Sequence, residues 1–390
     1  MAKYKLEEIF DLQMGKTPSR NTPEYWNTCD NKWISIGDLT HTGKYITETK
    51  EYLSDAAVEG SGIKIIPANT VVMSFKLSIG KTAITAEDMY SNEAIMAFHD
   101  KHVVELMPEY IYYMFKYKNW DEGTNKAVMG KTLNKATLSK VEIEVCSIEK
   151  QKEIVELLDK VSRILEARNE ELDKLDNLIK ARFVELFGDP KINEKNWNTG
   201  IVSQFYEVKG GKRIPKGMGY ADGITAHPYL RATDMKNETI LDDDIHYIDE
   251  VVFEKIKRYT VNGGDIYLTN VGVNLGMAGV IPNKYDGANI TENAVKLVPK
   301  TDGVLDGIFL AHYINSPGIQ DYINERKMSV GVPKLAIFRI ETMPLIIPPM
   351  NLQIEFINFC KQVDKSKVAV QKALDEAQLL FDSLMQEYFG

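Results

Sequence analysis

The feature of this sequence that most constrains its fold is an unbroken heptad pattern over Ile148–Phe187. Apolar residues recur there at steps of three and four, and two seam positions are taken by Arg168 and Arg182. No proline or glycine interrupts the pattern, and Gly188 and Pro190 follow it. The pattern therefore predicts one helix of roughly 40 residues, about 60 Å long. Because so long a helix cannot bury its apolar stripe against itself, it needs a partner of similar length.

A matching stretch lies 202 residues further along the chain. At this offset Gln151 corresponds to Gln353, and the terminal segment 186–188 corresponds to 388–390. Matched ends at one constant offset indicate an internal duplication rather than two unrelated amphipathic helices. We therefore predict two long helices that pair antiparallel as a coiled coil. The expected residues of the seam between them are Leu158, Val161, Leu165, Leu172, Leu175, Ile179, Val363, Val370, Leu374, Phe381 and Leu384.

Length and composition narrow the class of protein. A chain of 390 residues with 44% apolar residues is expected to form two or three packed domains. It has no run of about 18 apolar residues, and its start, MAKYKLEEIF, lacks an apolar signal core. The cysteines Cys29, Cys146 and Cys360 are far apart and form no CxxC pair, so neither a metal site nor a disulfide framework is expected. These features predict a cytoplasmic protein.

Short apolar runs typical of strands recur before the first long helix, each bounded by Gly, Pro, Asn or Asp. One helix is expected among them, from Pro108 to about Asn119. This mixture predicts an α+β domain with a mostly antiparallel sheet. The expected strands are Trp33–Ile36, Lys64–Ile66, Thr70–Phe75, Ala83–Thr85, Ala94–Phe98 and Val141–Val145.

The same order of motifs returns in the second half of the chain. GKTPSR at 15–20 and ISIGDL at 34–39 correspond, at an offset of 196, to GKRIPK at 211–216 and LRATDM at 230–235. Asn92-Glu93-Ala94 is matched in turn to Glu292-Asn293-Ala294. The predicted architecture is two α/β domains related by an internal repeat and separated by two long spacer helices. The expected segments are domain 1 at 1–146, helix 1 at 147–188, domain 2 at 189–348 with a linker at 189–196, and helix 2 at 349–390.

No motif for catalysis is complete. Two Gly-Lys-Thr fragments, at 80–82 and 130–132, resemble a phosphate-binding loop, but its first glycine is replaced by Phe75 and Asn125. The sequence has no HExxH, and its Pro348-Pro349 pair is not the clamp of a base-methylating enzyme. The acidic run 242–244 is expected to be a solvated turn rather than a metal site. The chain is therefore predicted not to be an enzyme by itself.

Local charge is more informative than the net charge of −9, which argues mildly against a general polyanion binder. The stretches 123–140, 208–221 and 326–340 each contain lysine or arginine and no acidic residue. Each alone is consistent with a solvated loop, but their recurrence in two repeated units favours contacts to phosphates and base edges. The candidate DNA-binding residues are Lys16, Arg20, Lys76, Lys81, Lys126, Lys131, Asn134, Lys135, Lys212, Arg213, Lys216, Thr269, Asn270, Asn274, Lys327 and Lys334.

Paired helices of this length suggest how two DNA-reading domains would work together. They would hold the domains a fixed distance apart, and an antiparallel pair would give a pseudo-twofold axis that matches a two-part target. Helix faces outside the seam would remain for partner subunits. The apolar residues at the helix ends that are expected to make such contacts are Phe183, Phe187, Leu380 and Phe389.

Taken together, these motifs resemble the specificity subunit of type I restriction-modification enzymes over essentially the whole chain. The first half carries GKTPSRNTPEYW, WISIGDL, SFKLSIGK and NEAI in this order. The second carries FRIETMPLIIPPMNLQ and ends with LLFDSLMQEYFG. One departure is KMSVGVPK at 327–334, where the family often has a turn rich in serine and threonine.

The resemblance implies a non-catalytic subunit with two target-recognition domains, each reading one part of a bipartite asymmetric DNA site. It implies that the spacer helices set the gap and dock two methyltransferase subunits, which would bind S-adenosylmethionine and flip adenines. A restriction subunit that uses ATP and Mg²⁺ would join them. No cofactor is expected in this chain.

Two other interpretations remain open. The chain could serve a methylation-only system that has no restriction subunit. It could instead be a coiled-coil assembly adaptor whose domains bind protein. Duplex affinity that falls steeply with salt would separate a DNA reader from an adaptor, because phosphate contacts release counterions.

Overall fold

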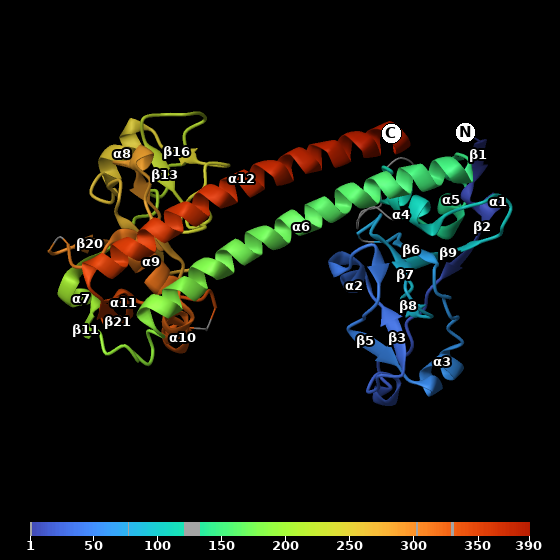
Figure 1. The fold of residues 1–390 in the computed structure, drawn as a ribbon, viewed down its shortest axis with the longest axis horizontal. Coiled ribbons are helices and arrows are strands. Elements are labelled where there is room, and N and C mark those ends of the chain that lie inside the picture. The colour runs from blue at the N-terminus through green and yellow to red at the C-terminus, as the bar shows by residue number, and fades with distance from the viewer. Residues whose placement is uncertain (1, 77, 121–132, 302, 329–330) are drawn as a thin grey trace. The chain divides into compact units, whose positions relative to one another are not determined.

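The structure is a computed structural model that describes residues 2–76, 78–120, 133–301, 303–328 and 331–390. Its contacts divide the chain into two compact units (Figure 1). Unit 1 comprises residues 1–169 and 371–390, and unit 2 comprises residues 170–370. Each unit therefore contains one globular domain together with parts of both long helices. Among the described residues, none of the helices has a stretch long and apolar enough to cross a membrane.

The two long helices are α6 (Ile148–Phe187) and α12 (Met350–Phe389), each 40 residues long (Figure 1). The predicted helix over 148–187 is confirmed, and Gly188, with a φ of 74°, follows its last residue. Within unit 2 the helices run antiparallel, since Arg182 of α6 pairs with Glu355 of α12 and Asp176 pairs with Lys367.

None of the predicted seam residues is exposed. On α6, Leu158, Val161 and Ile179 are buried. On α12, Val363 and Val370 are buried. The other six are half-buried: Leu165, Leu172, Leu175, Leu374, Phe381 and Leu384.

Three of the four apolar residues expected to face partner subunits are instead used inside the units. Phe183 and Phe187 are buried in the core of unit 2, where both rings contact Phe309 and Phe356. In unit 1 the half-buried Phe389 packs on Tyr110, with ring centroids 5.4 Å apart. That expectation is wrong for these residues, because the end of each long helix also serves as part of a domain core. Leu380 remains 50% exposed.

The globular part of unit 1 is an α+β domain, as the sequence predicts. Its elements are β1 (Ala2–Lys5), α1 (Leu6–Ile9), β2 (Phe10–Met14), η1 (Pro23–Tyr25), β3 (Asn31–Ile34), α2 (Ile36–His41), β4 (Tyr45–Ile46), β5 (Glu51–Leu53), α3 (Asp55–Ser61), β6 (Val71–Ser74), β7 (Thr82–Thr85), β8 (Tyr90–Ser91), β9 (Ile95–Asp100), α4 (Pro108–Tyr117), α5 (Lys135–Leu138) and β10 (Glu142–Val145).

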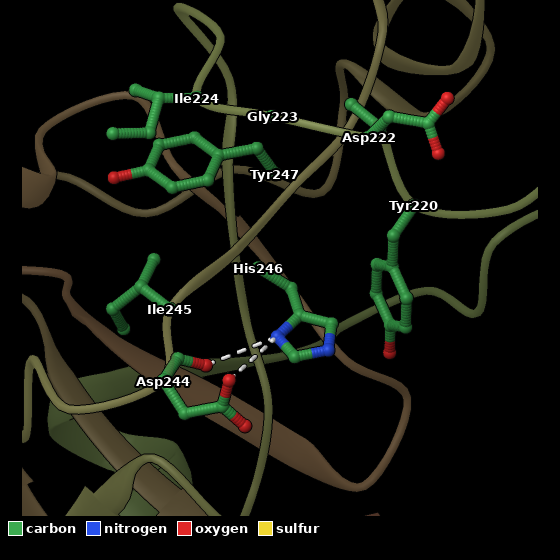
Figure 2. Close-up of a pocket in the computed structure, with 9 residues that line it drawn as sticks. Tyr220, Asp222, Gly223, Ile224, Asp244, Ile245, His246 and Tyr247 are labelled. Atoms are coloured by element: carbon green, nitrogen blue, oxygen red, sulfur yellow. Dashed lines mark hydrogen bonds and ion pairs between the residues drawn. The ribbon is translucent and has the colours of Figure 1, made fainter.

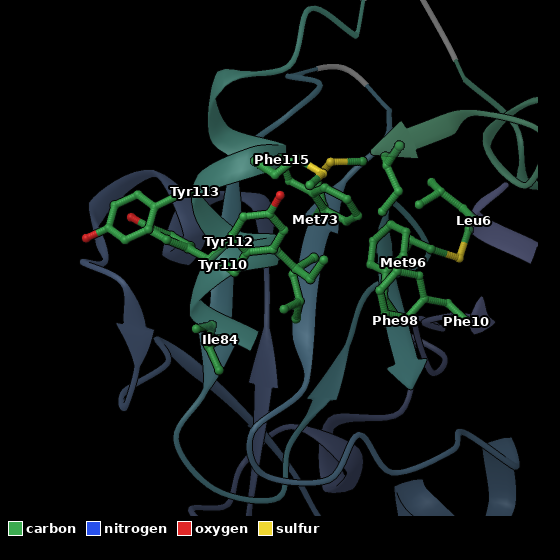
Figure 3. Close-up of a cluster of buried hydrophobic side chains, with 14 of the residues drawn as sticks. Leu6, Phe10, Met73, Ile84, Met96, Phe98, Tyr110, Tyr112, Tyr113 and Phe115 are labelled. Atoms are coloured by element: carbon green, nitrogen blue, oxygen red, sulfur yellow. The ribbon is translucent and has the colours of Figure 1, made fainter. Parts of the chain in front are cut away.

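The main sheet of unit 1 has five strands in the order β2-β9-β6-β7-β4, antiparallel except for the β7–β4 pair. A smaller sheet has the order β5-β3-β8, and β1 pairs with β10 just before α6. Helix α4 packs on β6 and β7, so that aromatic residues such as Tyr110 and Phe115 cover Met73 and Ile84 (Figure 3). The start of α6 and the end of α12 close this core through Leu158 and Met385, respectively.

Unit 2 repeats this order of elements. They are β11 (Asn198–Ile201), α7 (Val202–Phe205), β12 (Tyr206–Gly210), β13 (Pro228–Leu230), β14 (Met235–Lys236), β15 (Thr239–Ile240), β16 (His246–Tyr247), α8 (Glu250–Ile256), β17 (Ile266–Thr269), β18 (Ala278–Val280), η2 (Asn283–Tyr285), β19 (Asn289–Ile290), β20 (Ala294–Pro299), α9 (Gly307–Asn315), α10 (Pro317–Arg326), α11 (Ile337–Glu341) and β21 (Pro344–Ile347).

The sheets of unit 2 follow most of the topology of unit 1, although the main sheet has four strands rather than five and β14 and β15 pair only with each other. The main sheet has the order β12-β20-β17-β18, the smaller sheet β16-β13-β19, and β11 pairs with β21 just before α12. Both smaller sheets contain one parallel pair, β3–β8 in unit 1 and β13–β19 in unit 2. Equivalent strands in equivalent order confirm the internal repeat.

Several expected details change. The strand predicted to reach Ile36 ends at Ile34, because Ser35 caps helix α2 by accepting a hydrogen bond from the backbone of Asp38. The predicted strand at 64–66 is reduced to one bridge, at Ile66. Strands β9 and β20 begin 199 residues apart, so the expected match of Asn92-Glu93-Ala94 shifts by one residue and pairs Glu93 with Glu292.

A buried glutamine fixes the start of each long helix to its domain. In unit 1 the amide of Gln151 accepts a hydrogen bond from the backbone N–H of Met107 at 2.9 Å and donates to Glu105 and Cys146 carbonyls at 2.9 Å. In unit 2 Gln353 does the same with three backbone groups, those of Asp306, Val304 and Pro348. Both side chains are fully buried. The correspondence predicted between these two residues is therefore a structural one.

Candidate nucleic-acid interface

The basic motifs GKTPSR and GKRIPK follow β2 and β12 and form what we call the opening loop of each unit. Each begins at a glycine that passes very close to the turn before β9 or β20. A Cβ at Gly15 would lie 2.2 Å from the carbonyl oxygen of Asn92, and one at Gly211 would lie 2.1 Å from that of Thr291. Only glycine permits this approach, so both opening loops are placed against the same turn of their own unit.

Buried groups of the smaller sheet hold both opening loops in the same way. The indole N–H of Trp33 donates to the Lys16 carbonyl at 3.1 Å, and the hydroxyl of Tyr229 donates to the Lys212 carbonyl at 2.9 Å. Two different side chains thus perform one task at equivalent positions. The scaffold beneath the basic residues is common to the two units.

A carboxylate from the turn before β9 or β20 binds each opening loop. In unit 1 the hydroxyl of Thr17 donates to Glu93. In unit 2 the guanidinium of Arg213 pairs with Glu292 at 2.5 Å. Thr17 and Arg213 both stand two residues after the loop glycine. The sequence analysis identified the cations of these loops but missed both carboxylates, which lie far away in the sequence.

The candidate cations of unit 1 gather around this carboxylate. Arg20 and Lys76 both act on Glu93 by charge. The guanidinium of Arg20 lies 3.6 Å from the ring centre of Trp26 and makes two hydrogen bonds to Glu51, which raise its pKa. Arg20 is therefore held as a fixed, always charged donor group.

The remaining candidates of unit 1 are more loosely placed. The ammonium of Lys16 donates to the Ser61 carbonyl, and that of Lys81 donates to the Thr40 hydroxyl at 2.5 Å. Asn134 caps the short helix α5 through the backbone N–H of Thr137, and Lys135 follows it, exposed. Two further candidates, Lys126 and Lys131, lie outside the described residues.

Unit 2 has a cleft of about 510 Å³ beside its opening loop. Arg231 lies in its wall, bound to Asp234 at 2.7 Å and to Asp244 at 2.9 Å. The hydrogen bonds to these two carboxylates raise the pKa of Arg231. The cleft offers two cations, one anion, an amide and hydroxyl groups to a ligand. Its lining includes Arg213, Tyr220, Tyr229, Arg231, Thr291, Glu292 and Asn293.

Arg231 is a residue that the sequence analysis missed. It occupies the position of Ser35 in the matched motifs LRATDM and ISIGDL, so the replacement of serine by arginine was a visible signal. A second hollow of about 330 Å³ adjoins the same group of residues (Figure 2). There the ring of His246 lies 4.3 Å from that of Tyr220 and contacts Asp244. This aromatic and charged wall extends the surface of the cleft.

The other basic candidates of unit 2 are at its surface. Lys212 is exposed, with its ammonium 5.7 Å from the ring centre of Tyr259, and Lys216 is also exposed. Lys327 donates to Asn324 at 2.7 Å. Lys334 is exposed and forms a bridge with Val271, just after the end of β17.

The polar candidates 269–274 mainly build the loop rather than face solvent. Thr269 is fully buried, and its hydroxyl donates to the carbonyl of Asn274. Asn270 is 5% exposed and donates to Leu335 at 3.4 Å, while its side-chain oxygen has no described partner. In this structure Thr269 and Asn270 are positioning residues, and the half-buried Asn274 is the more accessible of the three.

The acidic run 242–244 is exposed, as expected for a solvated turn. Asp242 pairs with Lys284 and Asp244 with Arg231, so these carboxylates act as partners of cations. Over the described residues, no group of three or more His, Cys, Asp or Glu side chains could hold a metal ion.

The family model for the type I restriction modification DNA specificity domain matches residues 1–176 and 194–377. The chain belongs to this family. Each matched segment contains one opening loop, the main and smaller sheets of one unit and most of one long helix. The chain thus carries two specificity domains, and DNA sequence recognition in a type I restriction-modification system is its function.

Similar proteins agree with this assignment. The type I restriction enzyme MjaIX specificity subunit of Methanocaldococcus jannaschii is 24% identical over 407 aligned positions, covering 98% of this chain and 90% of that protein. The EcoR124I/EcoR124II specificity subunit of Escherichia coli is 28% identical over 177 positions, 43% of each chain.

Solved structures share the fold at low identity. The S subunit of the type I system from M. genitalium has a TM-score of 0.55 and 15% identity, with 100% of this chain and 96% of that one covered. A chain from a study of type I R-M complex assembly has a TM-score of 0.62 and 14% identity, with coverage of 100% and 97%. These matches support the specificity-domain fold of both units.

Proposed function

We propose that each unit of this specificity chain reads one part of a bipartite asymmetric DNA site. The observation that supports this most strongly is one scaffold used twice with different exposed groups. Gly15 and Gly211 place the opening loops identically, but Thr17 is replaced by Arg213 in unit 2. Equivalent placement fits two duplex segments of the same shape, and different side chains fit different sequences.

The long helices would set the gap between the two parts and dock two methyltransferase subunits. Apolar residues outside the seam support a docking role, because they are exposed on helices that already have a partner along one side. The partners would bring S-adenosylmethionine, and a restriction subunit would bring ATP and Mg²⁺. The chain itself is proposed to be non-catalytic. The exposed apolar residues are Ile164, Leu178 and Val184 on α6 and Ile354, Val368 and Leu379 on α12.

Duplex affinity measured as a function of salt, with the chain assembled with its methyltransferase partner, tests the DNA-reading role. A reader that contacts several phosphates loses affinity steeply as salt rises. Arg213→Ala is expected to weaken binding and to reduce the slope of log K against log salt by about 0.9, the loss of one phosphate contact. Lys131→Ala is expected to act likewise for the first half. Partner assembly should be unchanged in both variants.

A matched control is Lys300→Ala, which removes an exposed cation after the far end of β20, away from the opening loop. It should bind as the parent does. Parent-like binding by both Arg213→Ala and Lys131→Ala would show that these loops do not contact DNA. Duplex affinity that does not depend on salt would favour the adaptor interpretation instead.

A further inference from the structure

The turn before β9 in unit 1 and the turn before β20 in unit 2 carry a carboxylate at the same place. Glu93 lies two residues before β9 and Glu292 two residues before β20. Both accept hydrogen bonds from the residue two positions after the loop glycine, Thr17 in unit 1 and Arg213 in unit 2. The partner side chain changes from a hydroxyl to a guanidinium, whereas the carboxylate is kept. The element common to both units is therefore the acid.

Both carboxylates are accessible and ionised. The side chain of Glu292 is 30% exposed and lines the cleft of unit 2 together with Arg231. The hydrogen bond from Thr17 lowers the pKa of Glu93. Burial raises the pKa of Glu292, but the hydrogen bonds from Arg213, Thr291 and the backbone, together with the charge of Arg213, outweigh burial and bring the pKa below its usual value. Each unit thus presents a negative charge directly beside its basic opening loop.

A negative charge there opposes a polyanion, so it weakens duplex binding unless it gains a partner on the DNA. Arg213 is the present partner of Glu292. If the Arg213 guanidinium rotates toward a phosphate, the Glu292 carboxylate loses this hydrogen bond and requires another donor. Thr291 donates to the other oxygen of Glu292 at 3.0 Å and so keeps the group oriented.

A carboxylate can only accept hydrogen bonds, and this limits what it can read. In the major groove the bases that offer donors are cytosine, through N4, and adenine, through N6. Guanine and thymine present acceptors at the corresponding positions and would repel the acid.

On the proposed function of the two units, we propose that Glu93 and Glu292 are specificity-determining residues. Each accepts a hydrogen bond from the exocyclic amino group of one base, a cytosine or an adenine, in its own half of the DNA site. In unit 2 the same event frees Arg213 for the backbone, so that phosphate contact is completed only on the correct sequence. A wrong base at that position lowers affinity by about 10-fold or more.

The test is methylome sequencing of cells that express the chain with its methyltransferase partner. Glu292→Gln keeps the size of the side chain but adds a donor, so the methylated motif should relax or change at one base of the second half. The first half and the gap should be unchanged. Glu93→Gln should alter one base of the first half only. Glu207→Gln, at an exposed glutamate near the start of β12, is the control and should leave the motif intact.

Unchanged motifs in both variants, with affinity raised equally for all duplexes, would overturn the proposal, because the acids would then only tune charge. If Glu292→Gln abolishes modification, the Glu292→Asp variant, which keeps the carboxylate, decides between the two explanations. Methylation of the parent motif by Glu292→Asp supports base reading by the carboxylate. Loss of methylation in both Glu292→Gln and Glu292→Asp overturns the proposal. If no modification depends on the parent chain, the proposed function fails rather than this inference.

Discussion

The two units place their opening loops on the same backbone scaffold but carry different exposed side chains on it. Equivalent elements carry Gly15 and Gly211 against the same turn, and equivalent carbonyls are held by Trp33 and Tyr229. At the exposed positions the likeness ends. The arginine clamped between Glu51 and Trp26 in unit 1 corresponds to the exposed Lys216 in unit 2.

This contrast shows which parts of the repeat are tied to structure. Groups that satisfy buried backbone atoms recur, because an unmet backbone hydrogen bond inside a core is costly. Side chains that point to solvent do not have to satisfy buried backbone atoms, so they can differ between the two units. Arg231 is an example. Its backbone N–H donates to Asp234 at 2.7 Å, just as the backbone N–H of Ser35 donates to Asp38 at 2.8 Å. The side chain of Arg231, however, forms part of the cleft wall in unit 2.

A second difference lies where each domain meets its helices. In unit 1, Lys44 beside β4 donates to Asp159 of α6 at 2.6 Å, and Tyr113 donates to the same carboxylate at 2.5 Å. In unit 2, by contrast, Glu238 in the β14–β15 turn pairs with His312 of α9 at 2.9 Å, a contact that lies within the globular domain.

The largest predicted effect tests the shared scaffold. Gln353→Ala leaves three backbone groups without partners, so the free energy of unfolding of unit 2 should fall by about 3 kcal/mol. Gln151→Ala should do the same to unit 1. Hydrogen exchange of the chain in increasing denaturant would assign each loss to its unit.

Gln371→Ala is the control on the unit 1 part of α12, since among the described residues the side chain of this exposed glutamine donates to Asp375 alone. Its effect should stay within about 0.5 kcal/mol. A loss equally small in Gln353→Ala would mean that the repeated glutamines do not anchor the helices.

A smaller predicted effect is a loss of stability at low pH that is specific to unit 2. Burial raises the pKa of Glu238, but the hydrogen bonds from His312 and Asn315, together with the charges of His312 and Lys367, outweigh burial, so the pKa lies below its usual value. A lowered pKa gives stability that is present above the ordinary value and is lost as pH falls through the folded-state value. Unit 2 should therefore lose stability below about pH 4.5, and Glu238→Gln should flatten this dependence. If hydrogen exchange shows that unit 2 loses the same stability on acidification in the parent and in Glu238→Gln, Glu238 is not the cause of the pH dependence.

Much of this fold was predictable from the sequence because periodicity reports long helices directly. The stretch Ile148–Phe187 needed only its heptads and the glycine after it. The repeat was visible because Gln151 and Gln353 are fixed by burial. The partner role assigned to Phe183 and Phe187 was wrong, since periodicity cannot show that a helix end is shared with a domain core.

The candidate interface was less predictable. The opening loops could be found because cations cluster along the sequence there. Glu93 and Glu292 could not be placed, because the pairing of β9 with β2 and of β20 with β12 brings them to the loops from distant positions. Arg231 reaches the cleft likewise from the end of the separate strand β13. Thr269 shows the opposite failure, since a polar residue in a loop can be fully buried by its own turn.

We propose that the two units read two separate parts of one DNA site. Methylome sequencing of cells that express this chain with its methyltransferase partner tests it most directly. We expect a new methylated motif in two parts, separated by a fixed gap of unspecified bases. Modification that does not depend on the chain, or a motif in one continuous part, would contradict it.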